Sequence, residues 1–308
     1  MGVTAPRSLL FWIGEGCNSR CIMCWVDRRQ LAARRFMDVG IVRFCLERYP
    51  ELQDVNLSAF GEPLLHPQIG EIMRLARERG CSISCCTNGA LPGWTDGMAT
   101  SPGVLTVSCD SPDPVTYATI RRGLQLRDVV RNLEALQQHP DRHPGRSVNI
   151  SMVVLRNNRR QIAAMAKLAH GLGVSRIAVR RGYGLLPELK ELELVPDDQV
   201  VAEQLEMARS VGIPIDDVFS PATPCTVVGL EEHCQVPWDW AAVFWDGRVV
   251  PCCNSDDTMG CVAEDFWGGE RYCALRTQIE AGSVDAGQFP GCARCPALFP
   301  ARWHASAG

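Results

Sequence analysis

The sequence has no long hydrophobic run and no excess of positive charge. Its longest apolar segment near the start, residues 9–13, falls far short of the roughly 18 residues that span a bilayer, and it is too short for the apolar core of a signal peptide. The net charge is −4 over 308 residues, whereas a general nucleic-acid-binding protein carries a basic face. We therefore expect a cytoplasmic protein that binds neither membrane nor nucleic acid.

Cysteine, by contrast, is abundant, with 16 residues of this type in the chain. A disulfide framework is not expected, because the cytoplasm keeps thiols reduced. Half of these cysteines lie beyond Pro224. Metal or redox chemistry is therefore the favoured interpretation of the cysteine content.

Short apolar runs alternate with longer amphipathic segments between residues 8 and 180, which predicts a parallel sheet with crossover helices. Six units are too few for a closed eight-stranded barrel, so the expected fold is α/β, a partial (β/α)6 barrel of the TIM type. The predicted strands are 8–13, 54–58, 81–86, 104–109, 148–155 and 176–180, and the predicted helices are 28–48, 67–79, 114–138 and 160–172.

Prolines 214, 221 and 224 mark a linker. We therefore predict two domains, the barrel over residues 1–215 and a small C-terminal domain over residues 216–308. The second domain is expected to have little regular structure, and metal clusters would stabilise it in place of a large core.

Cys17, Cys21 and Cys24 follow the first predicted strand with the spacing C-x3-C-x2-C. Cysteine thiolates hold iron–sulfur clusters, and three protein ligands on a four-iron cluster leave one iron open for a substrate or cofactor. A structural zinc site is the alternative, although such sites usually combine four ligands. Barrel active sites lie in the loops after the strands, so a catalytic cluster is favoured.

With these cysteines, the chain resembles the radical S-adenosylmethionine (SAM) superfamily over most of residues 8–180. The resemblance implies a [4Fe–4S] cluster whose open iron binds SAM. It also implies an electron donor such as flavodoxin or ferredoxin, reductive cleavage of SAM, and a 5′-deoxyadenosyl radical that takes a hydrogen atom from the substrate. One departure is Met23, since the residue before the third cysteine is usually aromatic in this family.

Two motifs at the ends of predicted strands strengthen the resemblance. Gly61 and Glu62, followed by a proline, match the family's GE motif, whose backbone receives the SAM amino group. Thr87-Asn88-Gly89 after the third strand matches a common turn, and forming that turn is an equally good account of its whole role.

A serine and an arginine complete the expected SAM contacts. Ser108 ends the fourth predicted strand, and Arg122 follows it by 14 residues. The resemblance assigns the corresponding residues to the SAM ribose and carboxylate, and a guanidinium pairs well with a carboxylate. Arg121 is the alternative, which otherwise would be a solvated helix arginine.

A second set of cysteines lies in the C-terminal region. Residues 244–252 read as a β-hairpin that turns at Asp246-Gly247. A cysteine upstream of this hairpin, Gly247 at its turn, a cysteine at its end and a later C-x2-C pair form a pattern that resembles the auxiliary-cluster domain of the SPASM/twitch group. This resemblance implies a second [4Fe–4S] cluster. The implied ligands are Cys234, Cys252, Cys292 and Cys295. A zinc site of the same residues, or Cys225 in place of Cys234, is the alternative.

Cys253 lies next to a predicted cluster ligand, in a hairpin expected to face the barrel mouth. Its thiol is a candidate hydrogen-atom donor, although paired cysteines are frequent at this point of the domain family. The same region holds Trp238, Trp240 and Asp239, with Glu231 and Glu232 upstream. Aromatic faces and carboxylates suit a cationic sugar, whereas solvated acids and core tryptophans are the plainer interpretation.

These features resemble aminoglycoside-tailoring radical SAM enzymes such as neomycin C epimerase. The expected function is inversion of a carbon centre of an aminoglycoside sugar, with Cys253 returning the hydrogen atom. The alternative is a dehydrogenase that oxidises a hydroxyl of an aminocyclitol or amino sugar and uses the auxiliary cluster as electron acceptor. Peptide-modifying enzymes form a third class.

Overall fold

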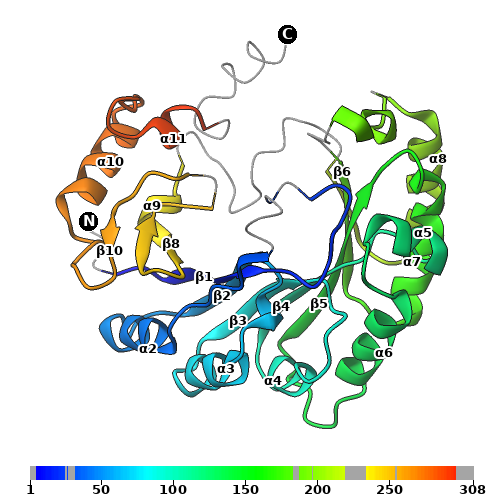
Figure 1. The fold of residues 1–308 in the computed structure, drawn as a ribbon, viewed down its shortest axis with the longest axis horizontal. Coiled ribbons are helices and arrows are strands. Elements are labelled where there is room, and N and C mark those ends of the chain that lie inside the picture. Colours follow the sequence, from blue (N-terminus) through cyan, green and yellow to red (C-terminus); the bar gives the residue numbers. More distant parts are fainter. Residues whose placement is uncertain are drawn as a thin grey trace.

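A computed structural model describes residues 5–24, 26, 32–182, 187–195, 197–218, 234–253 and 255–295 of the chain. Ten strands form one sheet in the order β10-β9-β8-β1-β2-β3-β4-β5-β6-β7. The sheet curves into an open ring, with the C-terminal elements beside β1 at one end and β6 at the other (Figure 1). The strands are β1 (Ser8–Gly16), β2 (Asp54–Gly61), β3 (Ser82–Thr87), β4 (Gly103–Ser108), β5 (Arg146–Val154), β6 (Arg176–Arg181), β7 (Ile215–Val218), β8 (Trp240–Phe244), β9 (Arg248–Val250) and β10 (Gly260–Cys261).

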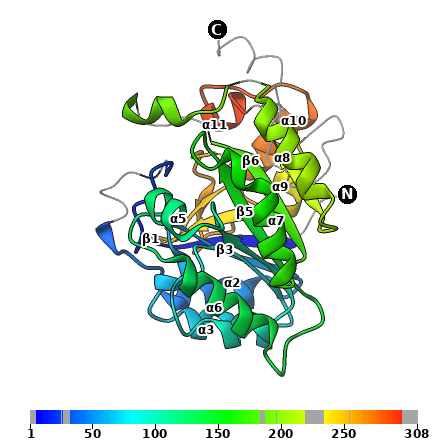
Figure 2. The ribbon, with the colours of Figure 1, turned by 90° about the vertical axis from the view of Figure 1, so that its right-hand side faces the viewer.

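Helices cover the outer face of the sheet, with α8 packed beside α7 (Figure 2). The α-helices are α2 (Val39–Arg48), α3 (Ile69–Glu78), α4 (Thr95–Ala99), α5 (Pro114–Ile120), α6 (Leu126–Gln137), α7 (Ile162–Gly171), α8 (Gln199–Arg209), α9 (Val236–Asp239), α10 (Glu270–Glu280) and α11 (Pro290–Ala293). Three 3-10 turns are η1 (Pro63–Leu65), η2 (Arg159–Gln161) and η3 (Pro187–Leu192).

The predicted α/β partial barrel is confirmed, because the six expected strands are present and pair in parallel from β1 to β6. A seventh parallel strand, β7, follows them and begins at Ile215, where the predicted domain boundary lies. The sequence of β7 is Ile-Asp-Asp-Val, which lacks the apolar run expected of a buried strand. It stands at the edge of the sheet, where Asp216 pairs with Arg176 of β6 at 2.9 Å.

Side chains alternate between the two faces of the sheet, as the period of a strand requires. In β5, Val148, Ile150 and Met152 are buried beneath the helices, whereas Asn149 and Ser151 are half-buried on the inner face. The apolar core therefore lies between the sheet and its helices, and the inner face of the middle strands is polar.

Two predicted helices are shorter than expected. The segment 114–138 forms α5 and α6 instead of one helix, because Gly123 has φ +94° and lies against the carbonyl oxygen of Asn18. In the segment 28–48, α2 begins only at Val39, since Phe36 instead forms a β-bridge with Gly14 of β1. Residues 28–31 of that prediction lie outside the described residues.

The C-terminal region has more regular structure than predicted. β8 pairs in parallel with β1, and β9 returns antiparallel from the predicted turn at Gly247, whose φ is +85°. Phe266 and Tyr272 of this region belong to the same buried cluster as the outer face of β1. The region is thus stabilised by a core shared with the barrel. No helix in the described part of the chain is long and apolar enough to cross a membrane.

Candidate active site

The loop after β1 brings Cys17, Cys21 and Cys24 to one cavity of about 190 Å³ at the carboxyl ends of the strands. The predicted contacts Gly61, Glu62 and Ser108 line this cavity as well, and Arg122 does not. The other lining residues are Ser19, Val26, Ala59, Cys86, Thr87, Asn88 and Arg121. The sequence motifs from β1, β2 and β4 therefore meet at a common site.

Hydrogen-bond donors point at two of these sulfurs. The Ser19 amide donates to Cys17 Sγ at 3.4 Å, and Arg121 Nη1 lies 3.8 Å from Cys21 Sγ. Ser19 Oγ, which donates to the Arg122 carbonyl, lies 3.1 Å from the same Cys21 sulfur. Burial raises the pKa of the Cys17 thiol to about 11, and iron binding would displace its proton. Donors of this kind stabilise negative sulfur, so the loop fits three thiolate ligands of an iron–sulfur cluster.

Gly61 has to be glycine. Its φ is +142°, and a Cβ atom there would lie 1.9 Å from the carbonyl oxygen of Gly16, its register partner in β1. The next amide, that of Glu62, donates to the same oxygen at 2.8 Å. The close approach fixes the end of β2 against the start of the cysteine loop.

The Glu62 carboxylate ties the ends of β2 and β3 together. It is 3% exposed and accepts hydrogen bonds from Thr87 Oγ1 at 2.6 Å, from the Asn88 amide at 2.7 Å and from the Leu64 amide at 3.1 Å. Burial raises its pKa above the ordinary value, although these donors oppose the shift. Asn88 Nδ2 also donates to Asn18 Oδ1 at 2.8 Å. The Thr-Asn-Gly turn thus supports the cysteine loop in addition to turning the chain.

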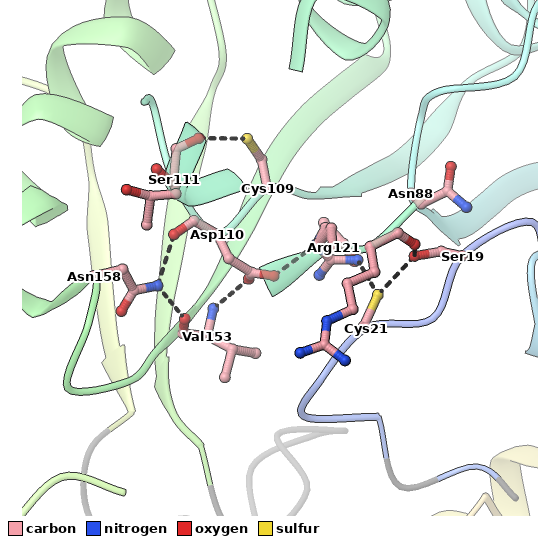
Figure 3. A network of polar contacts seen from close by, with 12 residues as sticks. Ser19, Cys21, Asn88, Cys109, Asp110, Ser111, Arg121, Val153 and Asn158 are labelled. Carbon is pink, nitrogen blue, oxygen red and sulfur yellow. Dashed lines mark hydrogen bonds and ion pairs between the residues drawn. The ribbon is translucent and has the colours of Figure 1, made fainter. Parts of the chain in front are cut away.

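Arg121 is a buried ion-pair partner, contrary to the solvated role considered for it from sequence. Its Nε lies 2.6 Å from Asp110 Oδ2, and the side chain of Asp110 is fully buried. Asp110 also accepts from the Val153 amide at 2.8 Å, and Asn158 Nδ2 donates to the Asp110 carbonyl at 2.7 Å (Figure 3). This network joins Cys21 to the end of β5. Sequence reasoning missed Asp110 and Asn158, although Asp110 directly follows the predicted Ser108 motif.

Arg122 lies beside the cysteine loop. Its carbonyl accepts from the Arg20 amide at 2.8 Å and from Ser19 Oγ at 3.1 Å. The side chain is exposed, and it has no hydrogen bond or ion pair within the residues that the structure describes. The charge of Arg121 is offset by Asp110, whereas that of Arg122 is available to a ligand. The assignment of Arg122 to the SAM carboxylate stays a prediction.

The four cysteines of the second set line one mainly apolar pocket formed by α9, the end of β9, α10 and α11. They are Cys234, Cys252, Cys292 and Cys295, with Val236, Pro237, Pro251 and Ile279 among their neighbours. Four thiols on a common apolar pocket fit the ligand set of an iron–sulfur cluster. The alternative ligand Cys225 lies outside the described residues.

Within the described ranges, no three His, Cys, Asp or Glu side chains are arranged to hold one metal ion. The cysteines of a four-iron cluster each bind a different iron, so their sulfurs need not converge on a single point.

Cys253 is half-buried and packs against apolar side chains on the inner face of β1, β8 and β9. Val250 pairs with Ala242, which pairs with Leu10, seven residues before Cys17. That spacing corresponds to roughly 20 Å along a strand. The hairpin turn therefore points toward the mouth, as predicted, whereas Val250, three residues before Cys253, pairs level with Leu10 in the amino-terminal half of β1.

Asp239 and the two tryptophans considered for a cationic sugar have other contacts. Trp240 is 6% exposed within the inner-face cluster, and Asp239 lies 4.0 Å from the Arg7 guanidinium. Trp238 packs against the main core. Glu231 and Glu232 lie outside the described residues. The core interpretation of these tryptophans is therefore the one that the structure supports.

Two family models match the chain, the radical SAM superfamily over residues 13–169 and an iron–sulfur cluster-binding (SPASM) domain over residues 234–296. A tungsten-containing aldehyde ferredoxin oxidoreductase cofactor-modifying protein of Pyrococcus furiosus is 26% identical, over 94% of each chain. A probable GTP 3′,8-cyclase of Methanococcus maripaludis is 24% identical, over 86% of this chain and 91% of its own. The structure of Streptococcus suis SuiB bound to SAM has a TM-score of 0.66 at 13% identity, covering 96% of this chain and 72% of that one.

The two matched domains together indicate three cofactors: a SAM-binding [4Fe–4S] cluster, SAM itself and an auxiliary cluster. They also imply a reductant. The first family model spans half of the chain and includes the three cysteines, Gly61, Glu62 and Ser108. The chain belongs to the radical SAM superfamily and carries a C-terminal SPASM-type iron–sulfur domain.

Proposed function

We propose that this enzyme inverts a carbon centre of a sugar substrate by removing one hydrogen atom and returning another from Cys253. The observation that carries the proposal is that Cys253 is half-buried against apolar side chains on the inner face of β1, β8 and β9, whereas the cysteine loop follows the carboxyl end of β1. Inversion needs abstraction and return on opposite faces of the carbon. A thiol on the inner wall and a radical source at the barrel mouth could approach one carbon from its two faces.

The chain's own residues have separate tasks. Cys17, Cys21 and Cys24 hold the cluster, Gly61 and Glu62 present backbone groups to the SAM amino group, and Ser108 and Arg122 contact its ribose and carboxylate. Cys234, Cys252, Cys292 and Cys295 hold the auxiliary cluster. When bound, the reduced cluster and SAM supply a 5′-deoxyadenosyl radical.

In the proposed inversion, each bond that breaks is matched by a bond that forms. A substrate C–H bond breaks and its hydrogen atom forms 5′-deoxyadenosine, which leaves a carbon-centred radical. The Cys253 S–H bond then breaks, and its hydrogen atom forms the new C–H bond on the opposite face. The resulting Cys253 thiyl radical needs one electron and one proton before the next turnover. An external one-electron donor of the flavodoxin or ferredoxin class supplies that electron.

Small hydroxyl side chains on the inner face support a sugar as substrate. Ser84, Thr106 and Ser151 are half-buried at inner-face positions of β3, β4 and β5, where hydroxyl groups can both donate to and accept from sugar hydroxyls. An aminoglycoside sugar, the substrate expected from sequence, also carries ammonium groups. Asp239 is paired with Arg7 and so offers them little. Aminoglycosides and uncharged cyclitols are therefore both to be assayed.

The test is anaerobic turnover of candidate aminoglycosides in heavy water. The thiol hydrogen of Cys253 exchanges with solvent, so one deuterium is expected at the inverted carbon. Cys253→Ala should still form 5′-deoxyadenosine but give little inverted product. Cys273→Ala is a matched control, because Cys273 is an exposed cysteine of the same region and should leave the product unchanged. If deuterium incorporation persists in Cys253→Ala and disappears in Cys86→Ala, then Cys86, and not Cys253, returns the hydrogen atom.

A dehydrogenase is the second candidate, and the position of Cys252, the residue before Cys253, favours it. Cys252 lines the auxiliary-cluster pocket directly beside the proposed hydrogen donor, so a substrate radical near Cys253 is also near an electron acceptor. Oxidation would give a product two hydrogens lighter, with no deuterium gained and near-normal turnover in Cys253→Ala. That product pattern would replace the epimerase proposal.

A further inference from the structure

Asp257 is a buried carboxylate in the loop between β9 and β10, and it is 5% exposed. Its Oδ1 accepts a hydrogen bond from the Gly291 amide at 3.0 Å, and its Oδ2 accepts from the Cys292 amide at 2.9 Å. Ser255 Oγ donates to Oδ2 at 2.9 Å. All of these donors lie on the two segments that carry Cys252 and Cys292.

The same loop contacts both of these ligand segments. The Ser255 amide donates to the Cys252 carbonyl at 3.4 Å, and Ser255 Oγ lies 3.8 Å from Cys292 Sγ. A Cβ atom at Gly291 would lie 2.6 Å from Ser255 Oγ and 3.0 Å from Asp257 Oδ2. A Cβ atom at this position would have to displace Ser255 Oγ or Asp257 Oδ2, so the close packing holds Cys292 relative to Cys252.

Reduction potentials of iron–sulfur clusters depend on net charge, on hydrogen bonds to the sulfurs and on solvent exposure. Backbone amides beside a ligand cysteine are natural donors to cluster sulfur, and such bonds stabilise the reduced, more negative cluster. Here the amides of Gly291 and Cys292 are occupied by a carboxylate. The site therefore loses two donors to sulfur and gains a negative charge, and both effects disfavour reduction.

We infer that Asp257 is the positioning residue of the auxiliary cluster, holding the Cys292 segment in place and keeping the cluster's reduction potential low. The inference rests on the assignment of Cys292 as a ligand. A low potential makes the cluster a poor electron acceptor, which suits hydrogen return by Cys253 better than substrate oxidation.

The experiment is a redox titration of the reconstituted full-length enzyme, followed by electron paramagnetic resonance. Added SAM perturbs the signal of the cluster that binds it and so separates the auxiliary signal. Asp257→Asn keeps the size and removes the charge. Asp257→Ser also removes the charge, with less bulk, should the amide variant not fold. Asp256→Asn is the matched control, because Asp256 is the exposed neighbour.

We expect the auxiliary midpoint potential to shift upward in Asp257→Asn or Asp257→Ser and to stay unchanged in Asp256→Asn. Selective loss of the auxiliary irons in both Asp257 variants also supports the positioning role. A wild-type potential at full iron content in either Asp257 variant, or an equal shift in Asp256→Asn, overturns it. An iron count that Cys292→Ala leaves unchanged would instead reject the ligand assignment, so the two failures are distinguishable.

Discussion

The two cysteine sites of this chain differ in what surrounds their thiols. The mouth site lies in a cavity of about 190 Å³ whose wall includes the polar side chains of Glu62, Asn88, Ser108 and Arg121. The C-terminal site is lined mainly by apolar side chains and is closed by a fourth cysteine. The buried carboxylate of Asp257, next to this site, accepts hydrogen bonds from the Gly291 and Cys292 amides.

The difference follows from the chemistry that each site has to perform. An iron that accepts SAM needs an open coordination position and polar groups for an amine, a carboxylate and a ribose. Three cysteines and the polar side chains of the mouth site suit that proposed role. A cluster with four protein ligands has no open position, and an apolar shell around it sets its potential. Fixed backbone geometry is then the main requirement, and Asp257 and Gly291 meet it.

The largest effect is expected from cysteine substitutions that remove one cluster site at a time. About eight irons per chain are expected for two four-iron clusters. Cys17→Ala, Cys21→Ala or Cys24→Ala should lose about four irons and abolish SAM cleavage. Cys292→Ala should lose the other four and still cleave SAM. Iron analysis and 5′-deoxyadenosine assays check this, and a wild-type count near four irons, with zinc present, would remove the two-cluster assignment.

The next effect concerns the ion pair behind the mouth site. Arg121→Gln leaves the Asp110 carboxylate buried without its cation, and breaking a buried pair costs about 3–5 kcal/mol. Denaturant unfolding should show this loss, together with a mouth cluster that is released more readily than the auxiliary one. Arg131→Gln is the control, because its pair with Asp128 is exposed and exposed pairs contribute under about 1 kcal/mol. Equal losses of unfolding free energy in both variants would show that the Arg121–Asp110 pair stabilises the protein no more than an exposed pair does.

The sequence predicted those parts of the molecule that depend on local pattern and motif spacing. Apolar runs located the six strands, and cysteine spacing located both cysteine sets. The break at Gly123 was missed because it depends on contact with Asn18 in a distant loop. The Arg121–Asp110 pair was missed for a related reason: two polar residues on a helix end and a strand end look solvated until the fold buries them. β7 was missed because an edge strand needs little apolar character.

SAM affinity tests the role proposed for Arg122. Arg122→Ala should weaken SAM binding by about 2 kcal/mol, roughly 30-fold, because an ion pair to the SAM carboxylate is lost in a partly desolvated site. The variant should keep its iron and its stability, since the Arg122 side chain has no partner among the described residues. Arg127→Ala, an exposed arginine of α6, should bind SAM normally. Calorimetric titration with SAM decides, and normal affinity in Arg122→Ala would leave the carboxylate to another residue.

The smallest expected effect is that of a substitution in the C-terminal cysteine site. Gly291→Ala places a methyl group 2.6–3.1 Å from Ser255 Oγ, Asp257 Oδ2 and Asp256 Oδ1, and overpacking of this kind costs about 1–3 kcal/mol. The strain falls on the segment that holds Cys292, so auxiliary iron should decrease while SAM cleavage persists. Gly70→Ala in α3 is the control, because a Cβ atom there meets nothing within 4 Å. The mouth site is proposed to bind its cofactors in an open cavity, whereas the C-terminal cysteine site depends on close packing. One added methyl group is therefore expected to lower the iron content of the C-terminal site alone. If both sites lose iron equally in Gly291→Ala, their stabilities are coupled through the shared core.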